Sequence, residues 1–168
     1  VYRIVEKKKS LFCPSSKRQE QLGRIAVLAD AAHSLGAEQK GKRAGSIADF
    51  SCFSFHAVKN LTTAEGGAIV WRKGLPFDTD ELYHELQLWS LHGQNKDALA
   101  KTKLGAWEYD IVMPGYKCNM TDTLAALGVS QLHRYEEVLQ RRHDIVKRYH
   151  ALYVDALGCE DLPHEGED

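Results

Sequence analysis

The stretch SFHAVKNLTTAEGG, residues 54–67, places a single lysine, Lys59, between two segments that are predicted to be strands. Before it, DFSCFSF (residues 49–55) alternates between two faces, as a strand does. After it, GGAIVW (residues 66–71) is a short apolar run with the same expectation. A lysine at the end of a buried strand is costly unless its amine is paired, deprotonated or used covalently. The position therefore raises the question of whether Lys59 has a chemical role.

A third strand is predicted upstream, in RIAVLAD (residues 24–30), where residues 25–28 form a continuous apolar run. Such a run is typical of a strand buried on both faces. Residues 31–46 are predicted to form a short helical turn and then a loop rich in glycine and lysine. Strands with helical connections favour an α/β fold with a largely parallel sheet. The short link between the last two strands also allows them to pair antiparallel.

Helices are predicted on both sides of these strands. Residues 1–24 are compatible with helix, with a break at residues 13–16, and the piece SSKRQEQLG has a serine cap and a stop at Gly23. Residues 80–93 carry Leu82, Leu86 and Trp89 at helical spacing, and residues 94–118, with Trp107, are expected to be irregular. A long helical region is expected over residues 121–157, and its apolar face is predicted from Leu124, Leu127, Leu132, Tyr135 and Leu139.

Composition restricts the class of protein. The chain is 43% hydrophobic and 27% charged with a formal net charge of -1, which is typical of a globular domain with a core. No basic block is interleaved with aromatic residues, so nucleic acid is not an expected partner. The apolar runs are too short to span a bilayer, and the first residues lack the apolar core of a signal peptide. The four cysteines are widely scattered, which favours reduced thiols in a cytoplasmic protein.

Several polar residues are predicted to gather where the strands end. Asp30 ends one strand, His33 follows it, and Ser54 ends the next strand before Lys59. Ligands in α/β sheets bind beyond the carboxyl ends of the strands. A carboxylate, an imidazole, a hydroxyl and an amine are the groups that a pyridoxal phosphate site requires. Each residue alone also has an ordinary structural reading, and a metal site from Asp30, His33 and His56 is a weaker alternative because the spacing is irregular.

The segment ADAAHSLGAEQKGKRAGSIADFSCFSFHAVKNLTTAEGGAIV resembles the DegT/StrS family of sugar aminotransferases that use pyridoxal phosphate. That family has a DAAH or DAAQ strand end followed by an SFH-x-x-KN-x-T-T-x-EGG segment. A second block, LHGQNKDAL…WEYDIVMPGYKCNMTDTLAALGVSQL, is similar to the family's HG…GYNYRMTDIQAALGLAQL region. The resemblance covers roughly residues 25–150.

The resemblance implies a role for each candidate residue. Lys59 corresponds to the lysine that forms a Schiff base with the cofactor, and Asp30 to the carboxylate on the pyridine nitrogen. His33 takes the place of the His or Gln beside the cofactor ring, and Ser54 matches the serine that binds the phosphate. Asn119 matches an asparagine that reaches the phosphate bound by the neighbouring subunit, which implies a homodimer with shared active sites. No metal is implied.

The resemblance also implies a fold and a reaction. The fold is part of the large domain of a fold-type I pyridoxal-phosphate transferase, a mostly parallel sheet with flanking helices. Residues 1–118 would belong to this domain, and residues 119–168 would form the long linking helix and the start of a small C-terminal domain. Family members are over twice as long, so the chain is expected to be a central segment. The implied reaction transfers an amino group from L-glutamate to a keto group of a nucleotide-linked sugar.

Two alternatives to this reaction stay open. One is a sugar dehydratase of the same fold, although those relatives carry histidine where this chain has Lys59. The other is a non-catalytic scaffold or regulatory module of the same fold, against which the presence of Lys59, Asp30 and Ser54 argues.

Overall fold

The computed structural model describes residues 1–95 and 108–158. The chain divides into two compact units. The first unit combines Val1–Ala26 with Gly74–Thr121, and the second combines Val27–Lys73 with the chain from Asp122 onwards. Trp107 and residues 159–168 lie outside the described residues. The predicted division at residues 118 and 119 stays a prediction.

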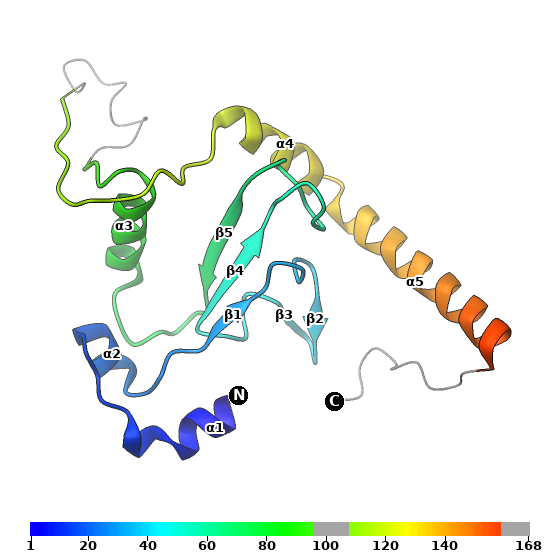
Figure 1. Cartoon of the computed structure of the whole chain (residues 1–168), viewed down its shortest axis with the longest axis horizontal. Coiled ribbons are helices and arrows are strands. Elements are labelled where there is room, and N and C mark those ends of the chain that lie inside the picture. Colours follow the sequence, from blue (N-terminus) through cyan, green and yellow to red (C-terminus); the bar gives the residue numbers. More distant parts are fainter. Residues whose placement is uncertain (96–107, 159–168) are drawn as a thin grey trace. The chain divides into compact units, whose positions relative to one another are not determined.

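The second unit is built around a small mixed sheet of β1 (Leu28–Asp30), β4 (Phe50–Ser54) and β5 (Gly67–Trp71). Figure 1 shows β4 between its two neighbours, in the order β1-β4-β5. Strand β1 pairs parallel with β4, and β5 pairs antiparallel with β4. The alternation predicted for β4 is confirmed, because Ser51 and Phe53 are buried while their neighbours are half-buried. Both pairings left open by the sequence therefore occur in one sheet.

A buried carboxylate holds the three strands together at one edge of the sheet, where β1 and β4 begin and the antiparallel β5 ends. Asp49, directly before β4, is fully buried. Its Oδ2 accepts a hydrogen bond from the backbone N–H of Val27 at 2.8 Å, and its Oδ1 accepts one from Nε of Arg72 at 2.9 Å. Val27 precedes β1 and Arg72 follows β5. Asp49 thus fixes the register of the sheet at the end opposite to Asp30 and Ser54.

The strand upstream is less buried than predicted. Leu28 is 63% exposed, and β1 is only three residues long. Strand β1 lies at an edge, because among the described strands it has a neighbour, β4, on one side only, and no helix is found packed against it in the described residues. Within the described residues, the prediction that this strand is buried on both faces is therefore wrong.

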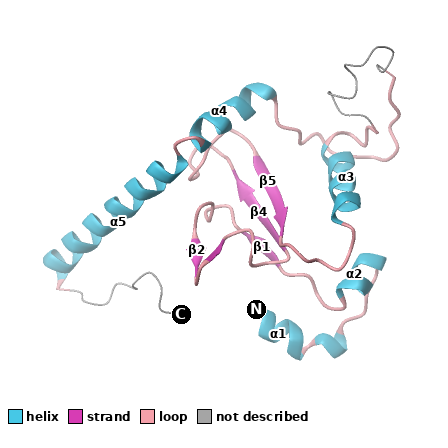
Figure 2. Cartoon of the chain, turned by 180° about the vertical axis from the view of Figure 1, so that it is seen from behind, coloured by secondary structure: helices cyan, strands magenta, loops and turns pink. Residues whose placement is uncertain are grey.

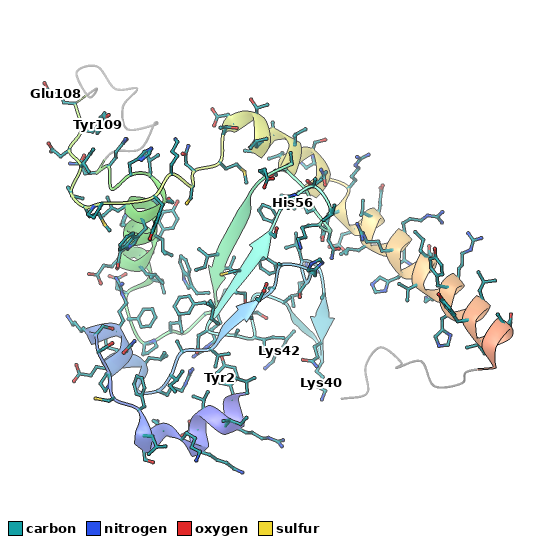
Figure 3. All side chains as sticks on the ribbon, in the orientation of Figure 1. Tyr2, Lys40, Lys42, His56, Glu108 and Tyr109 are labelled. Carbon is teal, nitrogen blue, oxygen red and sulfur yellow. The ribbon has the colours of Figure 1, made fainter. Side chains whose placement is uncertain are left out.

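The expected helical turn after β1 is a run of turns followed by a hairpin. Strands β2 (Glu38–Gln39) and β3 (Lys42–Arg43) pair antiparallel around Lys40 and Gly41. Both turn residues have positive φ, 52° and 72°. Two left-handed residues match the natural twist of a two-residue hairpin, and glycine takes this conformation without strain. Lys40 and Lys42 lie on this hairpin (Figure 3).

The predicted long helical region is two helices, α4 (Asp122–Leu132) and α5 (Tyr135–Leu157), as Figure 2 shows. The predicted apolar face is only partly right. Leu127 and Leu132 are 48% and 56% exposed, whereas Gly128 is buried. The helix contacts the loop between β4 and β5, because Gly128 lies against Thr63 and Gln131 is hydrogen-bonded to Thr62. Because α4 ends at Leu132 and α5 begins at Tyr135, the apolar residues predicted for one continuous helix do not form a single face.

The first unit contains short helices, of which α1 (Tyr2–Lys7), η1 (Lys9–Leu11) and α2 (Lys17–Leu22) come first. The predicted start and stop of α2 are confirmed, with Ser16 as the N-cap and Gly23 in the left-handed conformation. Helix α3 (Thr79–Ser90) begins at the cap Asp78, whose Oδ1 accepts the N–H groups of Glu81 and Asp80. These hydrogen bonds hold the pKa of Asp78 below its usual range.

The last residues of α3 and the segment after it are joined by backbone hydrogen bonds to residues 110–118. The N–H groups of His92, Tyr116 and Cys118 each donate across this pairing, at 2.7–2.8 Å. Gly93 has φ 73°, and a Cβ there would lie 1.9 Å from the carbonyl oxygen of Met113. The close approach of the two backbones therefore requires glycine. Among the helices of residues 1–95 and 108–158, none is long and apolar enough to cross a membrane.

Candidate active site at the carboxyl ends of β1 and β4

Asp30 and Ser54 lie at the carboxyl ends of neighbouring parallel strands. The register pairs Asp30 with Cys52, and the ladder continues with the hydrogen bond from Ala31 N–H to the Cys52 carbonyl at 2.9 Å. Asp30 is exposed, and its Oδ1 accepts from the N–H of Ala32 at 3.2 Å. Ser54 is half-buried, and its Oγ accepts from the N–H of His56 at 3.3 Å. The strand geometry thus places a carboxylate and a hydroxyl at one edge of the sheet.

Lys59 reaches the segment that follows β1. Its Nζ lies 2.6 Å from Nε2 of His33, although the two residues are 26 positions apart. An ammonium can only donate, so Nε2 of His33 must act as the acceptor when Lys59 is charged. Lys59 is half-buried and not fully buried as expected. The pairing places the amine beside the imidazole predicted to accompany it.

The loop that carries Lys59 is closed at its base. The carbonyl oxygen of Phe55 accepts from Thr63 N–H at 2.9 Å and from Thr62 Oγ1 at 3.2 Å. Phe55 N–H donates to the Gly66 carbonyl at 2.8 Å, so the chain returns directly into β5. A Cβ on Gly67 would lie 2.7 Å from the carbonyl oxygen of Phe53. The two threonines and the glycines of TTAEGG therefore shape the turn behind Lys59.

Two further polar side chains support this loop, and the sequence reasoning did not single them out. Asn60 donates through Nδ2 to the carbonyl oxygens of His33 at 3.2 Å and Leu35 at 3.3 Å. Gln131, on α4, forms two hydrogen bonds with the backbone of Thr62. Asn60 could have been suspected from its place directly after Lys59. Nothing in the sequence indicates that Gln131 reaches a loop 69 positions away.

His56 lies beyond the end of β4 and is exposed (Figure 3). Its Nε2 is 3.7 Å from Oε1 of Glu65, so it faces the far end of the loop. The metal site weighed for Asp30, His33 and His56 has no support in the geometry. Within the residues that the structure describes, no group of three histidine, cysteine or acidic side chains is placed to hold a metal ion.

Asn119 belongs to the first unit, whereas the four other candidate residues belong to the second. It is exposed and lies in the segment just before α4. Its Oδ1 accepts a hydrogen bond from Nζ of Lys117. The role that the resemblance gives to Asn119, like the roles of Lys59 and the other candidates, stays a prediction.

Comparison with known proteins shows which proteins this chain is similar to. The model of the DegT/DnrJ/EryC1/StrS aminotransferase family matches residues 18–167. The spore coat polysaccharide biosynthesis protein SpsC of Bacillus subtilis is 42% identical over 135 residues, which are 80% of this chain and 33% of SpsC. The UDP-4-amino-4,6-dideoxy-N-acetyl-beta-L-altrosamine transaminase of Campylobacter jejuni is 39% identical over 125 residues, 74% of this chain and 30% of the transaminase.

Solved structures of similar proteins share the fold of this chain. The structure of Spr1654 from Streptococcus pneumoniae in its PMP form matches with a TM-score of 0.84 and 57% sequence identity, over 90% of this chain and 38% of that one. Spr1654 is also known in a PLP form, which matches with a TM-score of 0.83. The likeness confirms the α/β fold class predicted from the sequence. The chain spans about a third of the length of these relatives.

Proposed function

The chain belongs to the DegT/DnrJ/EryC1/StrS aminotransferase family, and from this premise we propose that the full-length protein is a pyridoxal-phosphate-dependent sugar aminotransferase. It transfers an amino group from L-glutamate to a keto group of a nucleotide-linked sugar. The observation that carries the proposal is the contact of 2.6 Å between Nζ of Lys59 and Nε2 of His33. This contact occurs at the carboxyl end of parallel strands, where α/β proteins bind ligands.

The side chains at this edge fit pyridoxal phosphate in their chemistry. Lys59 offers an amine for the aldehyde, and Asp30 offers an exposed carboxylate for a protonated ring nitrogen. Ser54 offers a hydroxyl that accepts one hydrogen bond from His56 N–H and keeps its own proton free for a phosphate oxygen. His33 offers a ring nitrogen beside the amine. The amine, the carboxylate, the hydroxyl and the imidazole expected at such a site thus each have a counterpart at this edge.

When bound, the cofactor supplies an aldehyde and an electron-withdrawing ring that accepts the charge left when a proton is removed. The task of Asp30 is to hold the proton on the ring nitrogen, because a carboxylate favours a nearby positive charge. The task of Lys59 is to hold the cofactor and then, with its amine released, to move a proton as a general base and acid. The task of His33 is to orient Nζ of Lys59 through the contact described above.

The substrate class follows from the relatives. The transaminase from Campylobacter jejuni carries a UDP-4-amino sugar in its name, and SpsC is a polysaccharide biosynthesis protein. We therefore propose a nucleotide-linked keto sugar as amino acceptor and L-glutamate as donor. The presence of Lys59 disfavours the alternative of a sugar dehydratase, since dehydratase relatives carry histidine there. A cytoplasmic homodimer with shared sites, in which Asn119 reaches the partner's phosphate, is part of the same proposal.

The half-reaction with the amino donor tests this function. The full-length protein is loaded with pyridoxal phosphate and mixed with L-glutamate, and 2-oxoglutarate is measured together with the cofactor's absorbance. We expect one equivalent of 2-oxoglutarate per site and conversion of the cofactor to its amino form. Lys59→Ala should abolish the reaction, and Lys73→Ala, at an exposed lysine beyond β5, should leave it unchanged. A loaded protein that releases no 2-oxoglutarate would refute the proposed activity.

A further inference from the structure

We propose that Gln131, on α4, is a positioning residue for Lys59. It acts by holding the backbone of Thr62, three positions after the lysine. This inference rests on the proposed function, because it assigns Gln131 a part in presenting the Lys59 amine to the cofactor. Gln131 lies outside the loop and outside the candidate residues at the strand ends.

The contact between Gln131 and Thr62 has two points. Nε2 of Gln131 donates to the carbonyl oxygen of Thr62 at 2.7 Å, and the N–H of Thr62 donates to Oε1 of Gln131 at 3.1 Å. One carboxamide therefore satisfies both backbone groups of one residue, as a neighbouring strand would. A contact with two hydrogen bonds fixes the orientation of the peptide as well as its position.

The position of Thr62 determines the path of the loop that carries Lys59. Thr62 Oγ1 donates to the carbonyl oxygen of Phe55 at 3.2 Å, which closes the loop at its base. On the other side, Asn60 donates to the carbonyl oxygens of His33 and Leu35. The short segment with Lys59 is thus held between α4 and the residues after β1. Gln131 is the residue through which α4 holds Thr62, by two side-chain hydrogen bonds.

Helix α4 packs closely against the loop at Gly128 and Thr63. A Cβ on Gly128, three positions before Gln131, would lie 3.0 Å from Cγ2 of Thr63. Thr63 is 1% exposed, so its side chain has no room to move away. The helix is therefore seated on the loop at the distance that lets the Gln131 side chain reach Thr62. Removing the carboxamide leaves the packing at Gly128 in place and takes away only the two hydrogen bonds.

The expected consequence is a slower attachment of the cofactor. With Thr62 released on one side, Lys59 samples orientations away from His33, and the fraction poised for attack on the aldehyde falls. Two ordinary hydrogen bonds correspond to about a tenfold change in such a population or somewhat more. We therefore expect the rate of attachment to Lys59 to fall roughly tenfold.

The test uses the full-length apo protein and pyridoxal phosphate, with stopped-flow absorbance as the measure of attachment to Lys59. Gln131→Ala removes both hydrogen bonds, and Gln131→Glu keeps the shape but places an acceptor against the Thr62 carbonyl. Both should attach the cofactor roughly tenfold more slowly than wild type. Gln140→Ala, which removes an exposed glutamine bonded to Asp144 on α5, is the matched control and should attach at the wild-type rate.

A second readout separates positioning from loss of structure. Hydrogen exchange of the apo protein should rise at residues 60–63 in Gln131→Ala while exchange in β4 stays at the wild-type level. If Gln131→Ala does not fold, Gln131→Met, which keeps the volume of the side chain, carries the same expectation. An attachment rate equal to wild type in the folded variants would overturn the role of Gln131. A wild-type protein that never attaches the cofactor at Lys59 would instead overturn the proposed function on which this role rests.

Discussion

Removing the carboxylate of Asp49 is expected to destabilise the sheet that presents the site. Asp49 is 0% exposed, and it accepts one hydrogen bond from Val27 N–H and one from the guanidinium of Arg72. Each hydrogen bond to a charged group contributes about 1.5–3 kcal/mol. The Arg72 side chain is 29% exposed and regains water when Asp49 is lost, which lowers the sum. We expect Asp49→Ala to cost about 3 kcal/mol of unfolding free energy.

The measurement is urea unfolding of the full-length protein, followed by tryptophan fluorescence. The matched control is Glu136→Ala, which removes one acid from an exposed pair with Arg43 at 3.8 Å. An exposed pair of this kind contributes at most about 1 kcal/mol. If Asp49→Ala and Glu136→Ala cost the same, the buried carboxylate does not hold the sheet and the reasoning fails. Should Asp49→Ala prove insoluble, Arg72→Ala, which leaves the buried Asp49 carboxylate without its cation, is expected to cost about 3–5 kcal/mol and decides the question.

The remaining predictions concern the site and the first unit. Asp30→Asn should keep the cofactor bound but lower turnover at least ~100-fold, because a neutral amide does not hold the ring proton; near wild-type turnover would contradict this role. Asn119→Ala should weaken cofactor binding by about one to two powers of ten. Mixing Asn119→Ala with Lys59→Ala subunits should restore part of the tight binding, and heterodimers without any restoration would exclude a shared site. Gly93→Ala should cost about 2 kcal/mol or more in thermal or urea unfolding, since its Cβ meets the Met113 carbonyl oxygen; an unchanged stability would show that this backbone contact relaxes freely.

The parts of the fold that the sequence predicts are those decided by local pattern. The alternation in residues 49–55 predicts β4, and Gly23 and the serine before α2 predict the ends of that helix. The hairpin of β2 and β3 was missed because its strands carry charged side chains without apolar alternation. The Lys-Gly pair at residues 40–41 is the signal that could have indicated it.

Features that depend on distant contacts could not be predicted in this way. The exposure of β1 depends on which strands lie beside it, and the apolar run of residues 25–28 does not contain that information. The buried residue of α4 is Gly128, which lies close to Thr63, whereas the larger Leu127 and Leu132 are exposed. The contact between Lys59 and His33 joins two residues of the motif, but the sequence alone did not predict it. The hydrogen bonds of Asn60 and Gln131 join residues that are far apart in the sequence, so they can be identified only from the folded structure.

The central claim is that Lys59 is the residue that binds pyridoxal phosphate. Its direct test is borohydride reduction of the loaded full-length protein, which fixes a lysine-bound cofactor as a stable amine, followed by peptide mapping. We expect the label on Lys59, in the peptide that contains residues 54–67, and no label in Lys59→Ala. A label on Lys73, Lys117 or another lysine, with Lys59 unmodified, would show that Lys59 does not bind the cofactor.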